Sequence, residues 1–245
     1  MKKILAKIYT VLFTVSVFLI FGFVAIMIPA SSQAFYRSQF EKYDVLKSVQ
    51  FQHRYLEDEN AREYIQTLTD EELDDLMMHV VRYCLFLEDD LNITVDGVHL
   101  EIFRDDEYSH MQDVKNVFGG GLIIVLVSVI IILVGVVLFL IYRKGYYENC
   151  RKIPFITLAV IGGLLVLVAL YALIDFESAF TLFHVILFDG NWMFSHGVMI
   201  TMIGQIFFDI VPIIAVIWIG LILSYVLALY LYNKILAKKS RNLSK

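Results

Sequence analysis

Three ionisable side chains recur at every third position shortly before a long apolar stretch: Glu107, His110 and Asp113. On a helix, positions at this spacing stay within roughly 120° of arc, so all three side chains share one face. Histidine titrates close to neutral pH and can both accept and deliver a proton, and a neighbouring carboxylate can orient its ring. The pattern therefore predicts acid–base chemistry. A solvated polar helix end is the alternative that it leaves open.

A second histidine, His184, lies in an apolar and aromatic segment that runs into Gly190-Asn191-Trp192. A lone histidine among aromatic residues is usually a packed core residue. A second histidine delivered to the same side of a membrane favours a shared site instead. Trp192 is typical of a membrane interface, which suits its amphipathic ring. We therefore take His110 and His184 as the candidate catalytic pair.

The elements that must position these residues are membrane helices. The chain has 245 residues, of which 59% are hydrophobic and 18% are charged, whereas soluble domains average about 45–50% and about 25%. A helix needs about 20 apolar residues to cross a bilayer. Four stretches of that length contain no Asp, Glu, Lys or Arg: 8–28, 120–142, 153–174 and 210–231. The sequence predicts an all-α polytopic membrane protein with four transmembrane helices, and it excludes a soluble enzyme, a fibrous protein and a disordered chain.

Charge predicts the orientation in the membrane. Lysine and arginine residues cluster in 1–7, 143–152 and 232–245, which the positive-inside rule assigns to the cytoplasm. Residues 29–119 hold 20 acidic and 8 basic side chains and are expected to form an extracytoplasmic segment. The nearly apolar segment 175–209 carries Asp, Glu and His side chains that are costly at membrane depth, so we expect a second outer loop that lies in the interface or re-enters it. The candidate site would then face the extracytoplasmic side of the cell membrane.

Local patterns make residues 29–119 mostly helical. Thr69 and Glu72 match a capping box, in which each side chain satisfies a backbone N–H of the other residue. Apolar residues follow at helical spacing and predict a buried stripe that includes Cys84. The dipeptide Asp96-Gly97, between two short runs rich in β-branched residues, predicts a two-residue hairpin turn.

The residues around the second span carry three further expectations. Asp105 or Asp106 is expected to cap the helix that leads into this span. The run Gly119-Gly120-Gly121 permits a break where the helix enters lipid. Cys150 falls on the opposite side of the membrane from Cys84 in this topology, so the two cysteines are not expected to pair.

These stretches together resemble the lipoprotein intramolecular transacylase (Lit) family of Gram-positive bacteria. The resemblance rests on Glu107-x-x-His110-Met111-x-Asp113, on Phe180-Thr181-Leu182-Phe183-His184 and on Gly190-Asn191-Trp192, and it covers the whole chain. It implies transfer of the sn-2 acyl chain of a diacylglyceryl lipoprotein to the α-amino group of its N-terminal cysteine, giving a lyso-form lipoprotein. The two key histidines of the family correspond to His110 and His184. This sequence has a histidine, His196, where a less basic turn is expected.

The implied chemistry suits these residues. Ester-to-amide exchange is downhill, so no ATP, cofactor or metal is expected. The attacking amine, with a pKa of about 8, must lose a proton, and the leaving alkoxide must regain one. Glu107 or Asp113 could orient an imidazole, and Asn191 or a backbone N–H could stabilise the tetrahedral oxyanion. The expected partners are the lipoprotein and membrane lipid, with no nucleic acid.

Two other functions and one other mechanism remain open from the residues alone. Glu107, His110 and His184 could bind zinc as a two-histidine, one-carboxylate hydrolase site. A non-catalytic membrane sensor or assembly module is the second alternative. Ser109 could act as an acyl-accepting nucleophile, but neighbouring helix positions point about 100° apart. We therefore expect direct attack by the amine of the substrate.

Overall fold

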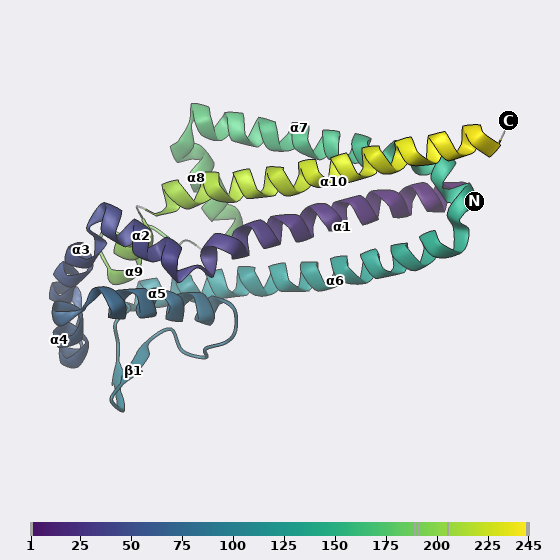
Figure 1. Ribbon diagram of the computed structural model, residues 1–245. Helices are drawn as coiled ribbons and strands as arrows, with labels where there is room; N and C mark the ends of the chain where they lie inside the picture. The colour runs from purple at the N-terminus through teal and green to yellow at the C-terminus, as the bar shows by residue number, and fades with distance from the viewer. Residues whose placement is uncertain (1, 189, 191, 205, 244–245) are drawn as a thin grey trace. The chain divides into compact units, whose positions relative to one another are not determined.

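The computed structural model describes residues 2–188, 190, 192–204 and 206–243. Helices make up most of this part of the chain, together with one two-stranded sheet (Figure 1). The elements in chain order are α1 (Lys2–Ala30), α2 (Gln33–Tyr43), α3 (Val45–Phe51), the 3₁₀ helix η1 (Gln52–Tyr55), α4 (Glu59–Thr67), α5 (Asp70–Cys84), β1 (Ile93–Val95), β2 (Val98–Leu100), α6 (Asp105–Cys150), α7 (Ile153–Ile174), α8 (Phe176–Leu187), α9 (Val198–Ile203) and α10 (Phe207–Leu243).

Four of these helices, α1, α6, α7 and α10, are long and apolar enough to cross a membrane. The predicted fold class, an all-α protein with four transmembrane helices, is confirmed. Helix α7 has the bounds of the predicted apolar stretch, Ile153–Ile174. The other three helices continue beyond their apolar stretches, because polar residues at a helix end can extend it into water without any cost of burial.

The chain forms two compact units, the span unit (residues 2–26, 123–175 and 214–243) and the cap unit (residues 27–122 and 176–213). In the span unit, α1 packs closely against two other helices. The Trp218 indole of α10 donates a hydrogen bond to the Phe18 carbonyl at 3.1 Å, and it fills the space that a Cβ on Gly22 would need. Phe13 of α1 likewise fills the space that a Cβ on Gly135 of α6 would need. Small residues thus let the helix backbones approach one another, as is common where lipid supplies no hydrophobic drive for helix association.

The cap unit has a hydrophobic core of its own. Helix α5 contributes the predicted stripe, with Leu73, Leu76 and Val80 all at most 2% exposed. The expected capping box starts this helix, because Thr69 and Glu72 each accept a backbone N–H from the other residue. Strands β1 and β2 pair antiparallel around the expected turn, whose residues Asp96 and Gly97 have φ values of 50° and 81°. The type of turn that such positive φ values allow is the one that two-residue hairpins favour.

One local expectation around the second span, the capping residue, is wrong, and the break that the glycines permit does not occur. Helix α6 runs without interruption from Asp105 to Cys150, so the three consecutive glycines at 119–121 do not break it. Glycine permits a break but does not impose one, and the surrounding apolar residues keep the backbone helical. Asp105 and Asp106 lie inside the first turn rather than before it. The carboxylate of Glu107 instead accepts the N–H of Arg104, the residue that precedes the helix, at 3.3 Å.

Candidate active site

His110 lies on the first part of α6, in the cap unit, where the helix is still polar and has not reached its apolar, membrane-crossing stretch. Its side chain is only 8% exposed. Its ring centroid lies 4.7 Å from that of Phe188 and 5.4 Å from that of Phe194. Burial lowers the pKa of His110, the nearby His184 lowers it further, and Asp113 opposes the shift. The imidazole is therefore held in its neutral form at neutral pH.

His184 lies on α8 and faces His110. The two imidazole centroids are 6.4 Å apart, and the ring planes are tilted by only 20°. The Nδ1 atom of His184 lies 2.8 Å from the carbonyl oxygen of Phe180, one helical turn earlier. A carbonyl oxygen only accepts hydrogen bonds, so Nδ1 carries the proton, and in the neutral ring Nε2 keeps the lone pair. This one contact gives His184 the tautomer of a proton acceptor at Nε2.

Aromatic rings pack around the two imidazoles, of which His110 is buried and His184 is half-buried. Phe180 lies 4.0 Å and Trp192 lies 4.7 Å from His184, centroid to centroid. Phe188 contacts both histidines, since its ring is also 5.4 Å from that of His184. The structure thus brings together His110, His184 and Trp192 from the sequence-based candidates. Phe188 and Phe194 were not singled out from the sequence, where only their aromatic character was available as a signal.

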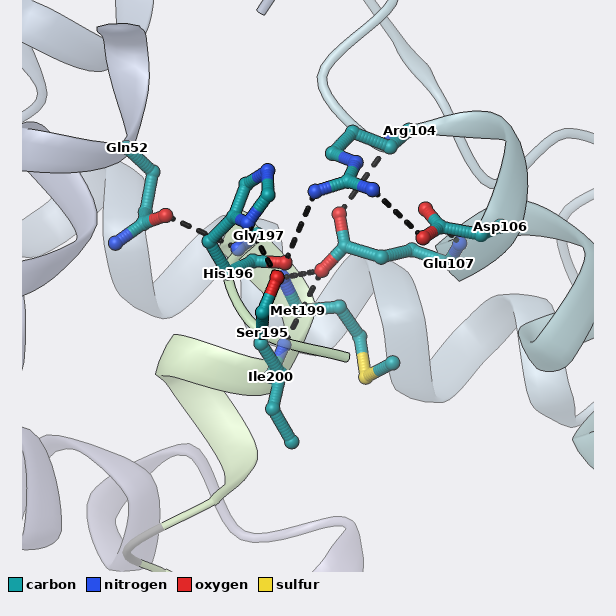
Figure 2. Close-up of polar contacts among 9 residues, drawn as sticks. All are labelled: Gln52, Arg104, Asp106, Glu107, Ser195, His196, Gly197, Met199 and Ile200. Atoms are coloured by element: carbon teal, nitrogen blue, oxygen red, sulfur yellow. Dashed lines mark hydrogen bonds and ion pairs between the residues drawn. The ribbon is translucent and has the colours of Figure 1, made fainter. Parts of the chain in front are cut away.

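Glu107 shares the helix face of His110 but contacts a different part of the cap unit. Its side chain is 0% exposed. Its Oε1 atom accepts the backbone N–H groups of Met199 and Ile200 at 2.9 and 3.3 Å, at the start of α9, as Figure 2 shows. Burial raises the pKa of Glu107 to about 7, although the hydrogen bonds that it accepts oppose the shift. In this structure its oxygens are engaged with backbone groups.

Of the remaining residues that the sequence singled out, the structure describes Asp113 and His196. The charge of Asp113 raises the pKa of His110, so the carboxylate acts on the imidazole at least electrostatically. Asn191 lies outside the described residues. The ring of His196 lies 4.2 Å from that of Tyr55, and its Nδ1 is 2.7 Å from the Ser195 hydroxyl, away from the His110–His184 pair in the contacts that it makes.

The alternative chemistries lack a matching arrangement among the described residues. No group of three or more His, Cys, Asp or Glu side chains is placed to hold a metal ion there. The oxygens of Glu107 accept backbone N–H groups rather than joining the two imidazoles. Cys84 is buried in the cap core, and burial raises the pKa of its thiol to about 12, which keeps it out of the thiolate form that a nucleophile needs.

Comparison with known proteins gives a consistent result. The profile of the family described as lipoprotein intramolecular transacylase Lit matches residues 10–208. No curated protein matches the chain. A structure of the membrane-integral transacylase Lit from Bacillus cereus is similar over 97% of this chain and 98% of its own, with 19% identity and a TM-score of 0.63. A structure of that enzyme with a histidine-to-arginine mutation is similar over 98% of this chain and 95% of its own, with 16% identity and a TM-score of 0.64. The structural likeness shows a shared fold.

Proposed function

Because the chain belongs to the lipoprotein intramolecular transacylase (Lit) family and so transfers an acyl chain within a lipoprotein, we propose that His110 and His184 carry out this transfer. The acyl chain moves from the sn-2 ester of a diacylglyceryl lipoprotein to the α-amino group of its N-terminal cysteine, and a lyso-form lipoprotein results. The observation that supports this proposal best is the pair of facing imidazoles, 6.4 Å apart, inside an aromatic enclosure.

In the first step, His184 acts as the general base. The amine of the substrate attacks the ester carbonyl carbon, and its proton passes to Nε2 of His184, the nitrogen that carries the lone pair. The resulting imidazolium keeps its Nδ1–H hydrogen bond to the Phe180 carbonyl, which stabilises the added positive charge. General base catalysis of this kind contributes roughly 10²–10⁴-fold to a rate.

In the second step, the tetrahedral intermediate collapses. The bond between the carbonyl carbon and the glyceryl oxygen breaks, and the leaving alkoxide takes one proton to become a hydroxyl. The imidazolium of His184 gives the alkoxide the proton that it took from the amine, so the reaction of the unprotonated amine needs no net acid or base. His110 is neutral at pH 7 because of its lowered pKa. Its N–H group donates a hydrogen bond to the oxyanion while the proton is transferred, a role for which a neutral imidazole is suited.

The aromatic rings around the histidines favour the amine over water as the nucleophile. Phe180, Phe188 and Trp192 present apolar surfaces to the imidazoles. An apolar enclosure excludes water and strengthens the electrostatic interactions within it. Because the ester and the amine belong to one molecule, folding the lipid so that they meet supplies much of the reduction in barrier.

The proposed substrate reaches this site from the membrane. Helix α8 exposes large apolar side chains beside His184, among them Phe183 at 52% and Ile186 at 70%. Exposed apolar side chains of this size make favourable contacts with acyl chains and unfavourable contacts with water. With basic residues clustered near the termini and between the second and third spans, the positive-inside rule assigns both termini to the cytoplasm and the site to the extracytoplasmic face.

A chemical distinction between ester and amide tests the proposed function. The reaction leaves the mass of the substrate unchanged, so we would incubate purified protein with a diacylglyceryl lipopeptide and then cleave esters with mild alkali. Unreacted substrate then loses both acyl chains, whereas the lyso product keeps one chain as an amide on its N-terminal cysteine. Tandem mass spectrometry locates that chain.

Matched histidine variants provide the control. His110→Ala and His184→Ala should each abolish the alkali-resistant product, whereas His79→Ala should not. His79 lies on α5 and its Nε2 is 3.0 Å from the Asp90 carbonyl, away from both imidazoles. A lipopeptide that loses the mass of one acyl chain and releases free fatty acid would indicate a hydrolase and would contradict the proposal.

A further inference from the structure

The segment from Trp192 to Ile200 supplies part of the wall of the site. Trp192 lies against His184, and Phe194 lies 5.4 Å from the ring of His110. A few residues later the chain enters α9, whose Val198 and Met202 are 0% exposed in the cap core. The position of Phe194 on His110 thus depends on how the residues between Phe194 and α9 are held.

Glu107 holds the end of this segment. Its Oε1 atom caps α9 by accepting the N–H groups of Met199 and Ile200, and its Oε2 atom accepts the N–H of Arg104 on the preceding turn of chain (Figure 2). One carboxylate therefore joins the start of α6 to the start of α9. His110 lies one turn further along α6, so the same helix presents the imidazole and fixes the segment that covers it.

Gly197 fits closely against this carboxylate. A Cβ at Gly197 would overlap the Oε1 atom of Glu107, and the backbone has a φ of 141°, which residues with side chains rarely adopt. On its other side, the N–H of Gly197 donates to Oε1 of Gln52 at 3.0 Å. Arg104 donates to the carbonyl oxygen of His196 at 3.4 Å and pairs with Asp106 at 2.7 Å. The segment is thus held by Arg104 just before α6, by Glu107 in its first turn and by Gln52 of η1 (Figure 2).

We propose that Glu107 is a positioning residue, which acts through the backbone of residues 197–200 to hold Phe194 against His110 and which does not exchange protons with the substrate. The proposal rests on the proposed function of His110. It differs from an imidazole-orienting role, because the hydrogen bonds that its oxygens accept from the described residues all come from backbone N–H groups. A carboxyl whose pKa is about 7 also accepts hydrogen bonds at one oxygen in either protonation state.

Four variants test this assignment. Glu107→Ala removes the contact from one side, and Gly197→Ala disrupts it from the other. Glu107→Gln keeps an oxygen for Met199 and Ile200 but has no charge, and it turns a donor toward the Arg104 N–H. Asp105→Asn, which neutralises an exposed carboxylate two positions away on the same helical turn, is the matched control.

We expect Glu107→Ala and Gly197→Ala to lower kcat by about 10²-fold with a smaller change in KM, because small displacements around a reacting group have effects of this size. Glu107→Gln should stay within about tenfold of the wild-type protein, since it loses one of three accepted hydrogen bonds. Asp105→Asn should match the wild-type protein. When Phe194 no longer covers His110, the ring gains solvent, its pKa rises toward the usual value, and the acid limb of the kcat profile moves to higher pH.

A readout that does not depend on activity separates this proposal from the proposed function. Diethylpyrocarbonate acylates accessible neutral imidazoles, and the modification of each histidine can be followed by peptide mass spectrometry. His110 should react faster in Glu107→Ala than in the wild-type protein, with His79 as an internal reference. The charges of His184 and Asp113 act on His110, and Asp106 and Arg104 lie beside Glu107, so the acid limb does not depend on the cover over His110 alone. The modification rate is therefore the decisive measurement.

Two results would overturn the positioning role. One is a folded Glu107→Ala protein, with a normal thermal unfolding midpoint, in which His110 is modified no faster than in the wild-type protein. The other is a Glu107→Gln protein as inactive as Glu107→Ala, which would mean that the ionisable carboxyl itself takes part in proton transfer. If wild-type protein forms no alkali-resistant product at all, the proposed function fails, while the modification rates still decide whether Glu107 holds the segment over His110.

Discussion

Replacing the two histidines singly and together with glutamine distinguishes a cooperating pair from two independent groups. Glutamine keeps a polar side chain of similar volume but cannot titrate near neutral pH. This choice matters because His110 is only 8% exposed and packs against Phe188. Alanine there would leave a void and cost on the order of 2 kcal/mol or more of folding stability.

The size of the expected effect follows from the geometry. Each group that acts in acid–base catalysis contributes about 10²–10⁴-fold, which corresponds to about 3–5 kcal/mol of transition-state stabilisation. Independent groups would therefore lose about 10⁴–10⁸-fold when both are removed. The imidazoles of His110 and His184 face each other at 6.4 Å and serve the same intermediate. Removing one leaves the other with little to do, so the double variant should be within about tenfold of the worse single variant.

The assay is the rate of formation of the alkali-resistant N-acyl lipopeptide at saturating substrate, with thermal unfolding of each variant as a check on folding. A double variant whose loss equals the product of the two single losses would refute the shared-intermediate mechanism. A single variant with near-normal activity would remove that histidine from the mechanism altogether.

The remaining predictions concern the nucleophile, the spans and the topology. Ser109→Ala should keep most of its activity, because Ser109 is exposed on α6 while the neighbouring imidazole is buried; complete loss of product from a folded Ser109→Ala protein would point to an acyl-serine intermediate. Gly22→Val should lower the unfolding midpoint, because a Cβ at this position would lie 2.8 Å from the Cζ2 atom of Trp218 and the indole must move. Overpacking of this kind costs about 1–3 kcal/mol. An unchanged midpoint in detergent would contradict the packing of α1 against α10. In a cysteine-free background, a membrane-impermeant maleimide should label Glu72→Cys in intact cells and Lys152→Cys only after the membrane is opened, and the reverse pattern would invert the topology.

The features that could be predicted from the sequence are those determined by neighbouring residues. The capping box of Thr69 and Glu72 and the Asp96-Gly97 turn depend on residues at most three positions apart. The four spans depend on runs of apolar residues that no soluble structure would tolerate. The two histidines could be proposed because histidine has few structural uses at a membrane surface.

The contacts of Glu107 could not be predicted, because they join positions that no local pattern connects. Its partner Met199 is 92 residues away in the chain, and the i, i+3 spacing to His110 suggested an imidazole partner instead. The isolated Gly197 ahead of a short apolar run was the one available signal of a close backbone approach. Whether a glycine run breaks a helix, as at 119–121, likewise depends on the surroundings rather than on the glycines themselves.

The cap unit is assembled from two parts of the chain that two membrane spans separate, and this has a consequence for biosynthesis. His184 is made 74 residues after His110, so at roughly 5–20 residues per second the ribosome adds it about 4–15 s later. Val198, Met202 and Ile206, which complete the core of the cap unit, are added later still. Until then the helices from α2 to α5 leave the ribosome with part of their apolar core uncovered. The core of the cap unit can therefore be completed only after the third span has been synthesised.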